Sequence, residues 1–181
     1  MSDSIPQSQI LAEGRFLNLR RQDGWEYASR PGARGVVAVV ATTCDDRVIL
    51  VEQHRTPVGG RVIELPAGLV GDEPGLEDEA PRIAAERELL EETGYHSDRW
   101  SDRSIEVVSS AGLTDETVRV FGAADAVRVA AGGGVGDERI EVHAVHLGEL
   151  GEWLDDRAAR GIPADGRVWA IPLFISRWRQ G

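Results

Sequence analysis

Three glutamates within five positions are the residues of this chain best suited to bind a divalent cation: Glu88, Glu91 and Glu92. Each residue of an α-helix advances about 100°, so these three carboxylates would fall within about a 100° arc of one helix face. Like charges at this spacing repel each other, and a hard cation that prefers oxygen ligands would remove the repulsion. A solvated acidic helix face is the alternative, and these residues by themselves leave it open.

A helix from about residue 81 to 93 must position these carboxylates. Pro81 suits its first turn, and Gly94 suits the left-handed residue that follows a helix. Arg87 precedes Glu91 by four residues, so it could hydrogen-bond that carboxylate and orient it. Apolar residues on both flanks of the acidic arc could pack and leave the acidic face open to a cleft. They are Ile83 and Leu90 on one flank, and Ala85 and Leu89 on the other.

Together with residues upstream, this run resembles the signature of the Nudix hydrolases. In that signature a glycine and a glutamate precede Arg-Glu-apolar-x-Glu-Glu-x-Gly-apolar at set intervals. Every position from Glu79 onward matches, but ten residues separate Gly68 from Glu79, where the family normally has half that number. The additional residues lie within 69–78, so we expect a lengthened loop that leaves the helix intact and alters the rim of the cleft. The matching positions are Gly68, Glu79, Arg87, Glu88, Leu89, Glu91, Glu92, Gly94 and Tyr95.

The resemblance implies an α/β fold, in which an α/β/α sandwich surrounds a central mixed sheet. It also implies a divalent metal, Mg²⁺ or Mn²⁺. The metal ligands of the family correspond here to the backbone carbonyl of Ala67 and to the carboxylates of Glu88, Glu91 and Glu92. Arg87 would orient these ligands and belongs with Glu88 and Glu92 among the expected catalytic residues.

A loop after the helix resembles the segment that carries the catalytic base in the ADP-ribose pyrophosphatase branch. Its sequence is Ser-Ala-Gly-Leu-Thr-Asp-Glu, and by position Glu116 would deprotonate the attacking water. Asp115 is its possible substitute. Ala111 stands where members that prefer ADP-ribose commonly carry proline, a difference that weakens the substrate assignment without affecting the metal site.

Residues 1–33 resemble the N-terminal β appendage of the same branch, which exchanges across a homodimer there. Strand-like runs at 14–21 and 25–30 flank a turn, which predicts a hairpin. The resemblance implies that Trp25 stacks on the nucleobase, that Arg30 binds the diphosphate and that Arg55 meets a phosphate or ribose. Trp25 could instead fill the contact between the hairpin and the core. Gly68 is the fourth residue expected at the substrate.

The remaining chain, 34–181, is expected to form one Nudix domain. The glycine run at 132–136 lacks the flanking strand and helix of a phosphate-binding loop, so we interpret it as a flexible connection. Apolar periodicity predicts strands at 35–42, 47–53, 105–109, 117–123 and 139–147, and helices at 148–160 and 168–179.

The composition restricts the class of partner and the compartment. The chain has 181 residues, 41% of them hydrophobic, and a formal net charge of −11. Such an acidic chain lacks the clustered basic residues that nucleic acid requires, so we expect no nucleic-acid partner. Cys44 is the single cysteine, which fits a reducing cytosol, and neither a signal peptide nor a membrane-spanning run is evident. We therefore expect a cytoplasmic protein with no membrane partner.

The function that these residues favour is metal-dependent hydrolysis of ADP-ribose, or of a related nucleoside diphosphate sugar, by a homodimer. The products would be a nucleoside monophosphate and a sugar phosphate. One alternative is a Nudix hydrolase that acts on nucleoside triphosphates or dinucleoside polyphosphates, which uses the same helix. The other is a non-catalytic regulator that binds a nucleotide sugar, which would not need the complete set of carboxylates.

Overall fold

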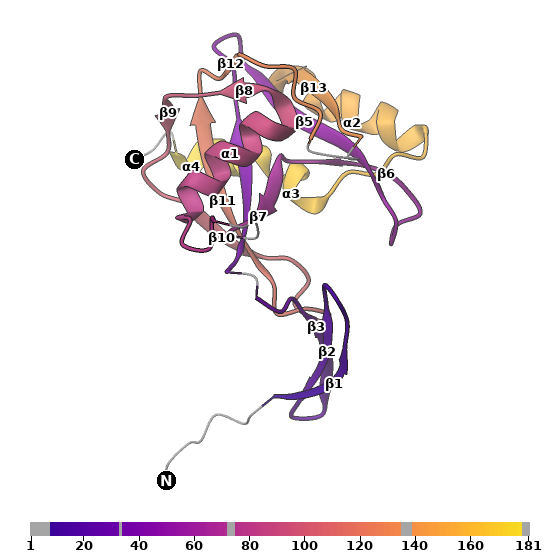
Figure 1. The fold of residues 1–181 in the computed structure, drawn as a ribbon. Coiled ribbons are helices and arrows are strands. Elements are labelled where there is room, and N and C mark those ends of the chain that lie inside the picture. Colours follow the sequence, from indigo (N-terminus) through magenta and orange to yellow (C-terminus); the bar gives the residue numbers. More distant parts are fainter. Residues whose placement is uncertain (1–7, 33, 72–74, 135–138, 179–181) are drawn as a thin grey trace.

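The structure is a computed structural model that describes residues 8–32, 34–71, 75–134 and 139–178. Its body contains two main β-sheets between helices and a two-stranded pair, and a separate three-stranded sheet projects from one end (Figure 1). The first sheet has the order β10-β11-β4-β7, with β9 on β11, and the second has the order β13-β5-β6. Because β4 and β11 are parallel and their other neighbours antiparallel, the predicted α/β fold with a mixed sheet is confirmed.

The strands of the body are β4 (Val36–Ala41), β5 (Arg47–Arg55), β6 (Gly60–Glu64), β7 (Ala67–Leu69), β8 (Tyr95–His96), β9 (Arg99–Trp100), β10 (Ile105–Val108), β11 (Thr117–Ala124), β12 (Val127–Arg128) and β13 (Glu141–His146). The helices are α1 (Pro81–Thr93), the 3₁₀ turn η1 (Leu147–Glu149), α2 (Leu150–Ala159), α3 (Gly166–Trp169) and α4 (Ile171–Trp178). The short strands β8 and β12 pair with each other.

Strand β4 separates two hydrophobic cores. Val37 and Val39 pack in the core that contains the buried residues of α1, whereas Ala38 and Val40 pack in the core that contains those of α2, α3 and α4. This division follows from the strand geometry, since successive side chains point to opposite faces of a sheet. Helix α1 is therefore fixed against one face, at the edge of the first sheet where β7 lies.

Only one flank of α1 packs against the body. Ala85 and Leu89 are fully buried, whereas Ile83 and Leu90 are 52% and 38% exposed. The prediction that both flanks pack is therefore wrong. The reason is that α1 is the outermost layer on its side, so that its second flank meets solvent (Figure 1).

The C-terminal end of α1 is capped by Gly94 and by two glycines from a distant segment, Gly133 and Gly134. Gly94 adopts the predicted left-handed conformation with φ of 73°, and its N–H donates to Leu90. The N–H groups of Gly133 and Gly134 donate to the carbonyl oxygens of Glu92 and Glu91, at 2.8 and 3.1 Å. Of the run 132–136 interpreted as a flexible connection, Gly133 and Gly134 instead satisfy the last carbonyls of the helix, and residues 135 and 136 lie outside the described residues.

The projecting sheet is formed by β1 (Gln9–Glu13), β2 (Asn18–Gln22) and β3 (Trp25–Ser29) in antiparallel order. The predicted hairpin between β2 and β3 is confirmed, and both residues of its turn, Asp23 and Gly24, have positive φ. Strand β1 was not predicted. We call this sheet the appendage.

The last predicted helix is divided in two. Helices α3 and α4 meet at Ala170, where the single helix expected at 168–179 would have continued. Pro172 explains the break, because proline has no N–H to donate within a helix and is tolerated only in the first turn. No helix in the described part of the chain is long and apolar enough to span a membrane.

Candidate active site

Arg87 and Glu79 form an ion pair at the start of the acidic helix face. The Nε and Nη2 atoms of Arg87 donate to the two carboxylate oxygens of Glu79 at 3.0 and 3.1 Å. The Glu79 side chain is only 2% exposed, and the bonds from Arg87 hold the pKa of Glu79 below its ordinary value in spite of burial. In turn, Glu79 raises the pKa of Arg87, so both partners stay charged.

The same guanidinium reaches the carboxylates of the helix. Arg87 Nη1 donates to Glu88 at 2.8 Å and to Glu91 at 3.1 Å, and Nη2 also donates to the carbonyl of Leu69 at 3.1 Å. The predicted hydrogen bond between Arg87 and Glu91 is therefore present. A planar guanidinium with several fixed donors can hold these carboxylates in a defined orientation.

Strand β7 meets the other side of the acidic face. The N–H of Ala67 donates to Glu92 Oε2 at 2.9 Å, and Glu92 is only 5% exposed. A side chain at Gly68 would lie 1.9 Å from Glu88 Oε1. The absence of a side chain at Gly68 thus lets Glu88 lie directly on the strand. The structure brings Ala67, Gly68, Arg87, Glu88, Glu91 and Glu92 together as predicted from the sequence.

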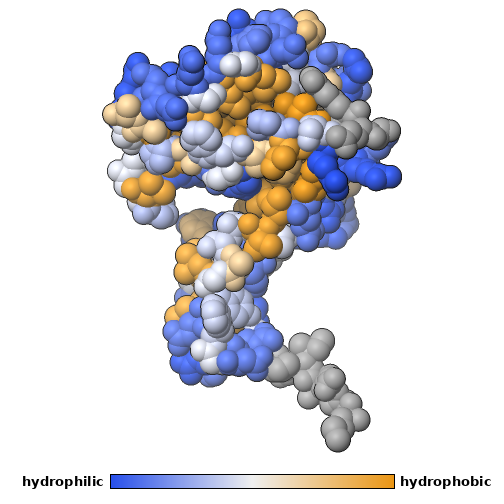
Figure 2. All heavy atoms as spheres, turned by 180° about the vertical axis from the view of Figure 1, so that it is seen from behind, coloured by the Kyte–Doolittle hydropathy of each residue, from blue (hydrophilic) through white to orange (hydrophobic). Residues whose placement is uncertain are grey.

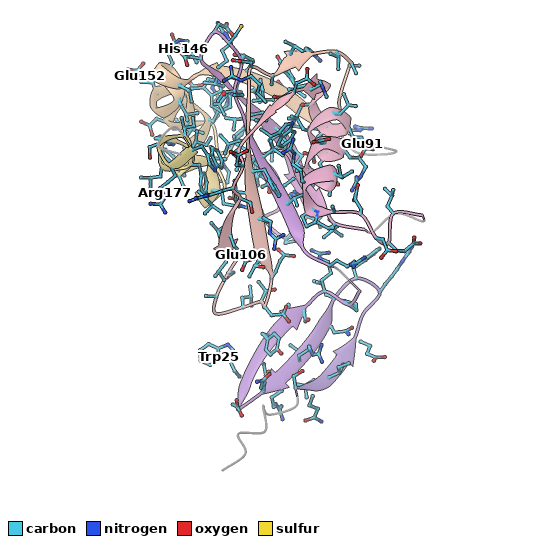
Figure 3. The ribbon with its side chains drawn as sticks, turned by 90° about the vertical axis from the view of Figure 1, so that its left-hand side faces the viewer. Trp25, Glu91, Glu106, His146, Glu152 and Arg177 are labelled. Atoms are coloured by element: carbon cyan, nitrogen blue, oxygen red, sulfur yellow. The ribbon has the colours of Figure 1, made fainter. Side chains whose placement is uncertain are left out.

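The arginines predicted at the substrate are paired with carboxylates. Arg30 donates through Nε and Nη2 to Glu116 Oε2, both at 3.4 Å, and Arg55 donates to Glu64 at 2.7 Å. Trp25 is 61% exposed and points away from the appendage sheet (Figure 3). It does not fill a contact with the core, but its indole N–H lies 3.4 Å from the carbonyl of Gly112.

Sequence reasoning missed Arg167, which lies beside these pairs. Its guanidinium donates to both oxygens of Asp165 at 2.7 and 2.9 Å, and Asp165 docks on β6 through its N–H and the carbonyl of Ile63. Burial raises the pKa of Asp165, but the bonds from Arg167 outweigh this effect and lower it. Glu64 and Glu116, the carboxylate partners of the two predicted arginines, also help to raise the pKa of Arg167. The sequence offered one signal, since an aspartate two residues before an arginine suits a helix start.

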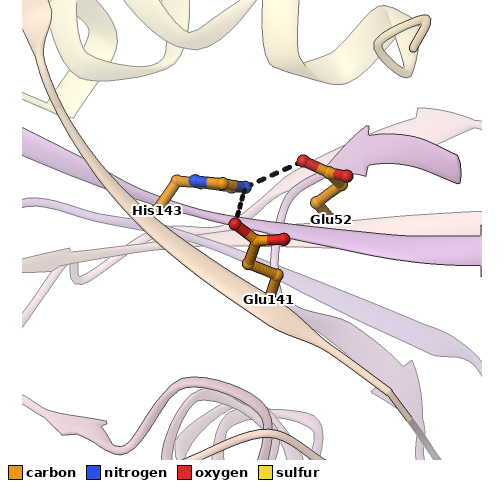
Figure 4. A group of neighbouring side chains, drawn as sticks. All are labelled: Glu52, Glu141 and His143. Atoms are coloured by element: carbon orange, nitrogen blue, oxygen red, sulfur yellow. Dashed lines mark hydrogen bonds and ion pairs between the residues drawn. The ribbon is translucent and has the colours of Figure 1, made fainter.

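A separate charged cluster lies on the sheet face opposite to α1. His143 Nε2 lies 3.0 Å from Glu52 and 3.8 Å from Glu141 (Figure 4). The three side chains are close enough to hold a metal ion. However, Arg61 also donates to Glu52, and Arg157 Nη1 lies 4.0 Å from it. Two guanidinium groups already balance the two carboxylates and would repel a cation, so we interpret the cluster as a structural ion network.

Two cavities lie apart from the acidic face of α1. One, of about 440 Å³, is lined in part by Trp100, Gly122 and Trp178. The other, of about 530 Å³, lies between Trp178 and the segment 101–105. No carboxylate of α1 lines either cavity. The charged groups therefore indicate the position of the active site better than these cavities do.

Residues 32–162 match the family model described as the NUDIX domain. Since the match covers more than half of the chain and includes α1, β7 and the loop with Glu116, the chain belongs to the Nudix family. A solved structure described as an ADP compounds hydrolase superposes with a TM-score of 0.68 over 99% of this chain and 98% of its own, at 19% identity. At that identity the likeness shows the shared fold.

Curated relatives have several names. The methanol dehydrogenase activator of Bacillus methanolicus is 35% identical over 65% of this chain and 63% of its own length. The ADP-ribose pyrophosphatase of Bacillus subtilis is 40% identical over 53% of this chain and 47% of its own length. The GDP-mannose pyrophosphatase of Cronobacter sakazakii is 36% identical over 90% of this chain and 88% of its own length. The alignments thus span about half to two thirds of the first two relatives and most of the third.

Proposed function

We propose that the chain is a metal-dependent pyrophosphohydrolase that cleaves the diphosphate of ADP-ribose or of a related nucleoside diphosphate sugar. The observation that carries this proposal is the contact of Glu88 and Glu92 with strand β7, with Arg87 bonded to Glu88 and Glu91, in a chain of the Nudix family. The relatives named ADP-ribose pyrophosphatase and GDP-mannose pyrophosphatase support the substrate class.

The donors of this face suit Mg²⁺, or Mn²⁺ in its place. They are all oxygens, namely the carboxylates of Glu88, Glu91 and Glu92 and the carbonyl of Ala67, and hard cations prefer oxygen ligands. Gly68 supports the assignment, because the space its missing side chain leaves is what allows Glu88 to approach the backbone. When bound, the metal supplies neutralising charge for the diphosphate and lowers the pKa of a nucleophilic water.

Residues of the chain carry out the proton transfer and bind the substrate. Glu116 accepts the proton of the water that attacks phosphorus, with Asp115 as the possible substitute, and the bond from phosphorus to the bridging oxygen breaks. Arg30 and Arg55 each exchange a carboxylate partner for an anionic phosphate oxygen, which a guanidinium binds with similar geometry. The exposed ring of Trp25 stacks on the nucleobase. The products are a nucleoside monophosphate and a sugar phosphate.

We also propose that the protein is a cytoplasmic homodimer. Its N-terminal appendage, residues 1–33, forms part of the dimer interface, and residues 34–181 form the catalytic domain. Several apolar side chains of the appendage are exposed, among them Phe16 at 64% and Leu17 at 49%. Figure 2 shows apolar surface on the body and along the connection between the body and the appendage. Burial of such surface in a second copy would stabilise the dimer.

Replacement of Glu92 by glutamine tests the proposal. Glutamine can still accept the bond from Ala67, but it removes the charge, so we expect turnover to fall to background with the fold retained. Glu86→Gln is the matched control, since Glu86 lies on the same helix but pairs with Arg82 at 2.9 Å. The assay follows phosphate release with Mg²⁺: alkaline phosphatase hydrolyses the monoester products formed from nucleotide sugars, and inorganic pyrophosphatase hydrolyses the pyrophosphate formed from triphosphates. Near wild-type turnover by Glu92→Gln would refute the metal role, a preference for triphosphates would favour the first alternative, and tight binding without turnover would favour a regulator.

A further inference from the structure

The loop that carries Glu116 has few contacts of its own with the body. It joins β10 to β11 and makes one turn, in which the N–H groups of Leu113 and Thr114 donate to the carbonyl of Ser110 at 2.9 and 3.0 Å. At its base, the N–H of Ser109 donates to the carbonyl of Glu116 at 3.0 Å, which ties the backbone of Glu116 to the end of β10 but leaves 110–115 without a hydrogen bond to the described part of the body. Every residue from 110 to 113 is exposed, and Leu113 is 64% exposed. A segment that buries so little side-chain surface needs other restraints to hold one conformation.

Strand β3 of the appendage provides such restraints through its backbone. The N–H of Ala28 donates to the carbonyl of Leu113 at 2.8 Å, and the N–H of Asp115 lies 3.4 Å from the carbonyl of Ala28. Ala28 and Thr114 form a parallel β-bridge. Although Ala28 stands opposite Leu19 of β2, its polar groups point to the other edge of β3, because alternate residues of a strand face alternate edges. The loop is therefore joined to the free edge of the appendage by an isolated β-bridge.

Side chains at both ends of β3 extend this contact. Trp25, at its start, directs its indole N–H to the carbonyl of Gly112. Arg30, just after its end, donates to Glu116 until a phosphate oxygen takes the place of that carboxylate, so the bonds from Ala28 and Trp25 are the ones that remain. The strand proposed to contact the nucleobase and the diphosphate is thus the strand that holds the loop of the proposed base. Movement of either would move the other.

We propose that β3 is the positioning element of the catalytic base, so that Ala28, through its backbone bonds to the loop, sets the position of Glu116. This inference rests on the proposed function. It implies that stacking of a nucleobase on Trp25, which fixes the strand, also fixes the base. Binding energy from the nucleotide half of the substrate would then appear in kcat and not only in KM.

Proline substitution on β3 separates this role from a general effect on the appendage. Ala28→Pro removes the N–H that bonds Leu113, while the bonds between β2 and β3 are made by the alternate residues. Glu26→Pro is the matched control, because Glu26 lies two residues away on the same edge and, among the described residues, donates no backbone bond to the loop. The exposed ion pair that Glu26 makes with Arg21 contributes little.

With ADP-ribose and Mg²⁺, we expect Ala28→Pro to lower kcat at least about tenfold with KM within about threefold, since displacement of a catalytic group by about 1 Å can cost about a hundredfold. Glu26→Pro should remain within about twofold of wild type. In a Glu116→Gln background, Ala28→Pro should lower kcat no further, because both changes act through one group. Equal kcat for the two proline variants, or additive losses with Glu116→Gln, would overturn the proposal.

Amide hydrogen exchange tests the restraint without any turnover. We expect faster exchange at Thr114 and Asp115 in Ala28→Pro than in Glu26→Pro, with exchange in β2 unchanged. Unchanged loop exchange would overturn the inference, whereas a wild-type chain inactive on all substrates would instead refute the proposed function. If Ala28→Pro does not fold, Trp25→Phe removes the indole N–H bonded to Gly112 while keeping a smaller aromatic ring, and it should shift loop exchange in the same direction. No shift in that variant would also count against β3 as the restraint.

Discussion

A single methyl group added at Gly68 should lower kcat at least about a hundredfold while leaving the protein folded. In Gly68→Ala the new carbon would lie 1.9 Å from Oε1 and 2.5 Å from Oε2 of Glu88. Ordinary van der Waals contact requires about 3.4 Å, so the carboxylate must move by about 1.5 Å. The φ angle of Gly68 is not positive, so alanine causes no backbone strain at this position.

The size of this displacement decides the outcome. Metal ligands tolerate deviations of about 0.2 Å from ideal distances, so a carboxylate displaced by more than 1 Å is lost from the coordination shell. Misplacement on this scale costs about a hundredfold in rate, and we expect kcat to fall at least that far. The stability cost is limited, because the group that moves is the end of a flexible side chain. Loss of the bond from Arg87 to Glu88 should cost about 1.5–3 kcal/mol.

Gly60→Ala is the control for this experiment. Gly60 also lies in a strand without positive φ, but a side chain there would meet nothing within 4 Å. We expect wild-type kcat and thermal stability from the control. Mg²⁺ titration by calorimetry, alongside steady-state kinetics and urea unfolding, would separate metal loss from unfolding. Normal Mg²⁺ affinity and normal kcat in Gly68→Ala would refute the contact between Gly68 and Glu88 as the basis of the site.

Three further predictions concern stability. Arg61→Ala should lower the free energy of unfolding by about 1–3 kcal/mol in urea, because it leaves the buried carboxylate of Glu52 with fewer donors; an unchanged midpoint would contradict this. Burial raises the pKa of Glu52, but the bonds from Arg61 and His143 outweigh it and lower the pKa below 4.5. Because the pKa of Glu52 is lower in the folded than in the unfolded protein, its negative charge stabilises the fold at pH values above the unfolded-state pKa, and this contribution is lost as pH falls through the folded-state pKa. The difference in free energy of unfolding between wild type and Glu52→Gln should therefore shrink as pH falls below about 4.5, and a constant difference would contradict this. Gly122→Ala places a carbon 2.5 Å from the ring of Trp178, so a loss of about 1–3 kcal/mol and altered tryptophan fluorescence are expected, whereas wild-type values would show that α4 adjusts freely.

The acidic helix could be predicted because its information is local. The spacing of Glu88, Glu91 and Glu92 and the glycine at position 94 describe one face and one end of a single helix, and the structure has both. Arg87 could be assigned to Glu91 from the same spacing. Its pairing with Glu79, which precedes the helix, required the position of the preceding loop and could not be derived from helical periodicity.

Contacts between distant segments could not be predicted from the sequence. His143 and Glu52 are separated by 91 residues and meet only because β13 pairs with β5 in one register. Arg167 likewise reaches the site because α3 docks against β6. Burial of charge is the shared physical reason, since a charged side chain looks solvated in sequence until its partner is known.

The flanks of α1 show a different limit. Apolar residues on both sides of a helix predict two packed flanks, but Ile83 and Leu90 remain exposed because no further layer covers that side. The number of layers in a fold is a global property, and a helical pattern read over a few turns does not contain it.

The glycines that cap α1 have a consequence for engineering. A run of this composition looks like a permissive place to cut the chain for circular permutation, to insert a reporter or to lengthen a linker. Here the N–H groups of Gly133 and Gly134 donate to the carbonyls of Glu92 and Glu91, two of the three glutamates of the acidic face. A side chain at Gly132 would lie 2.3 Å from the backbone of Thr93. An insertion between 132 and 134 would therefore loosen the helix from its far end and weaken ion affinity, although it alters no acidic residue.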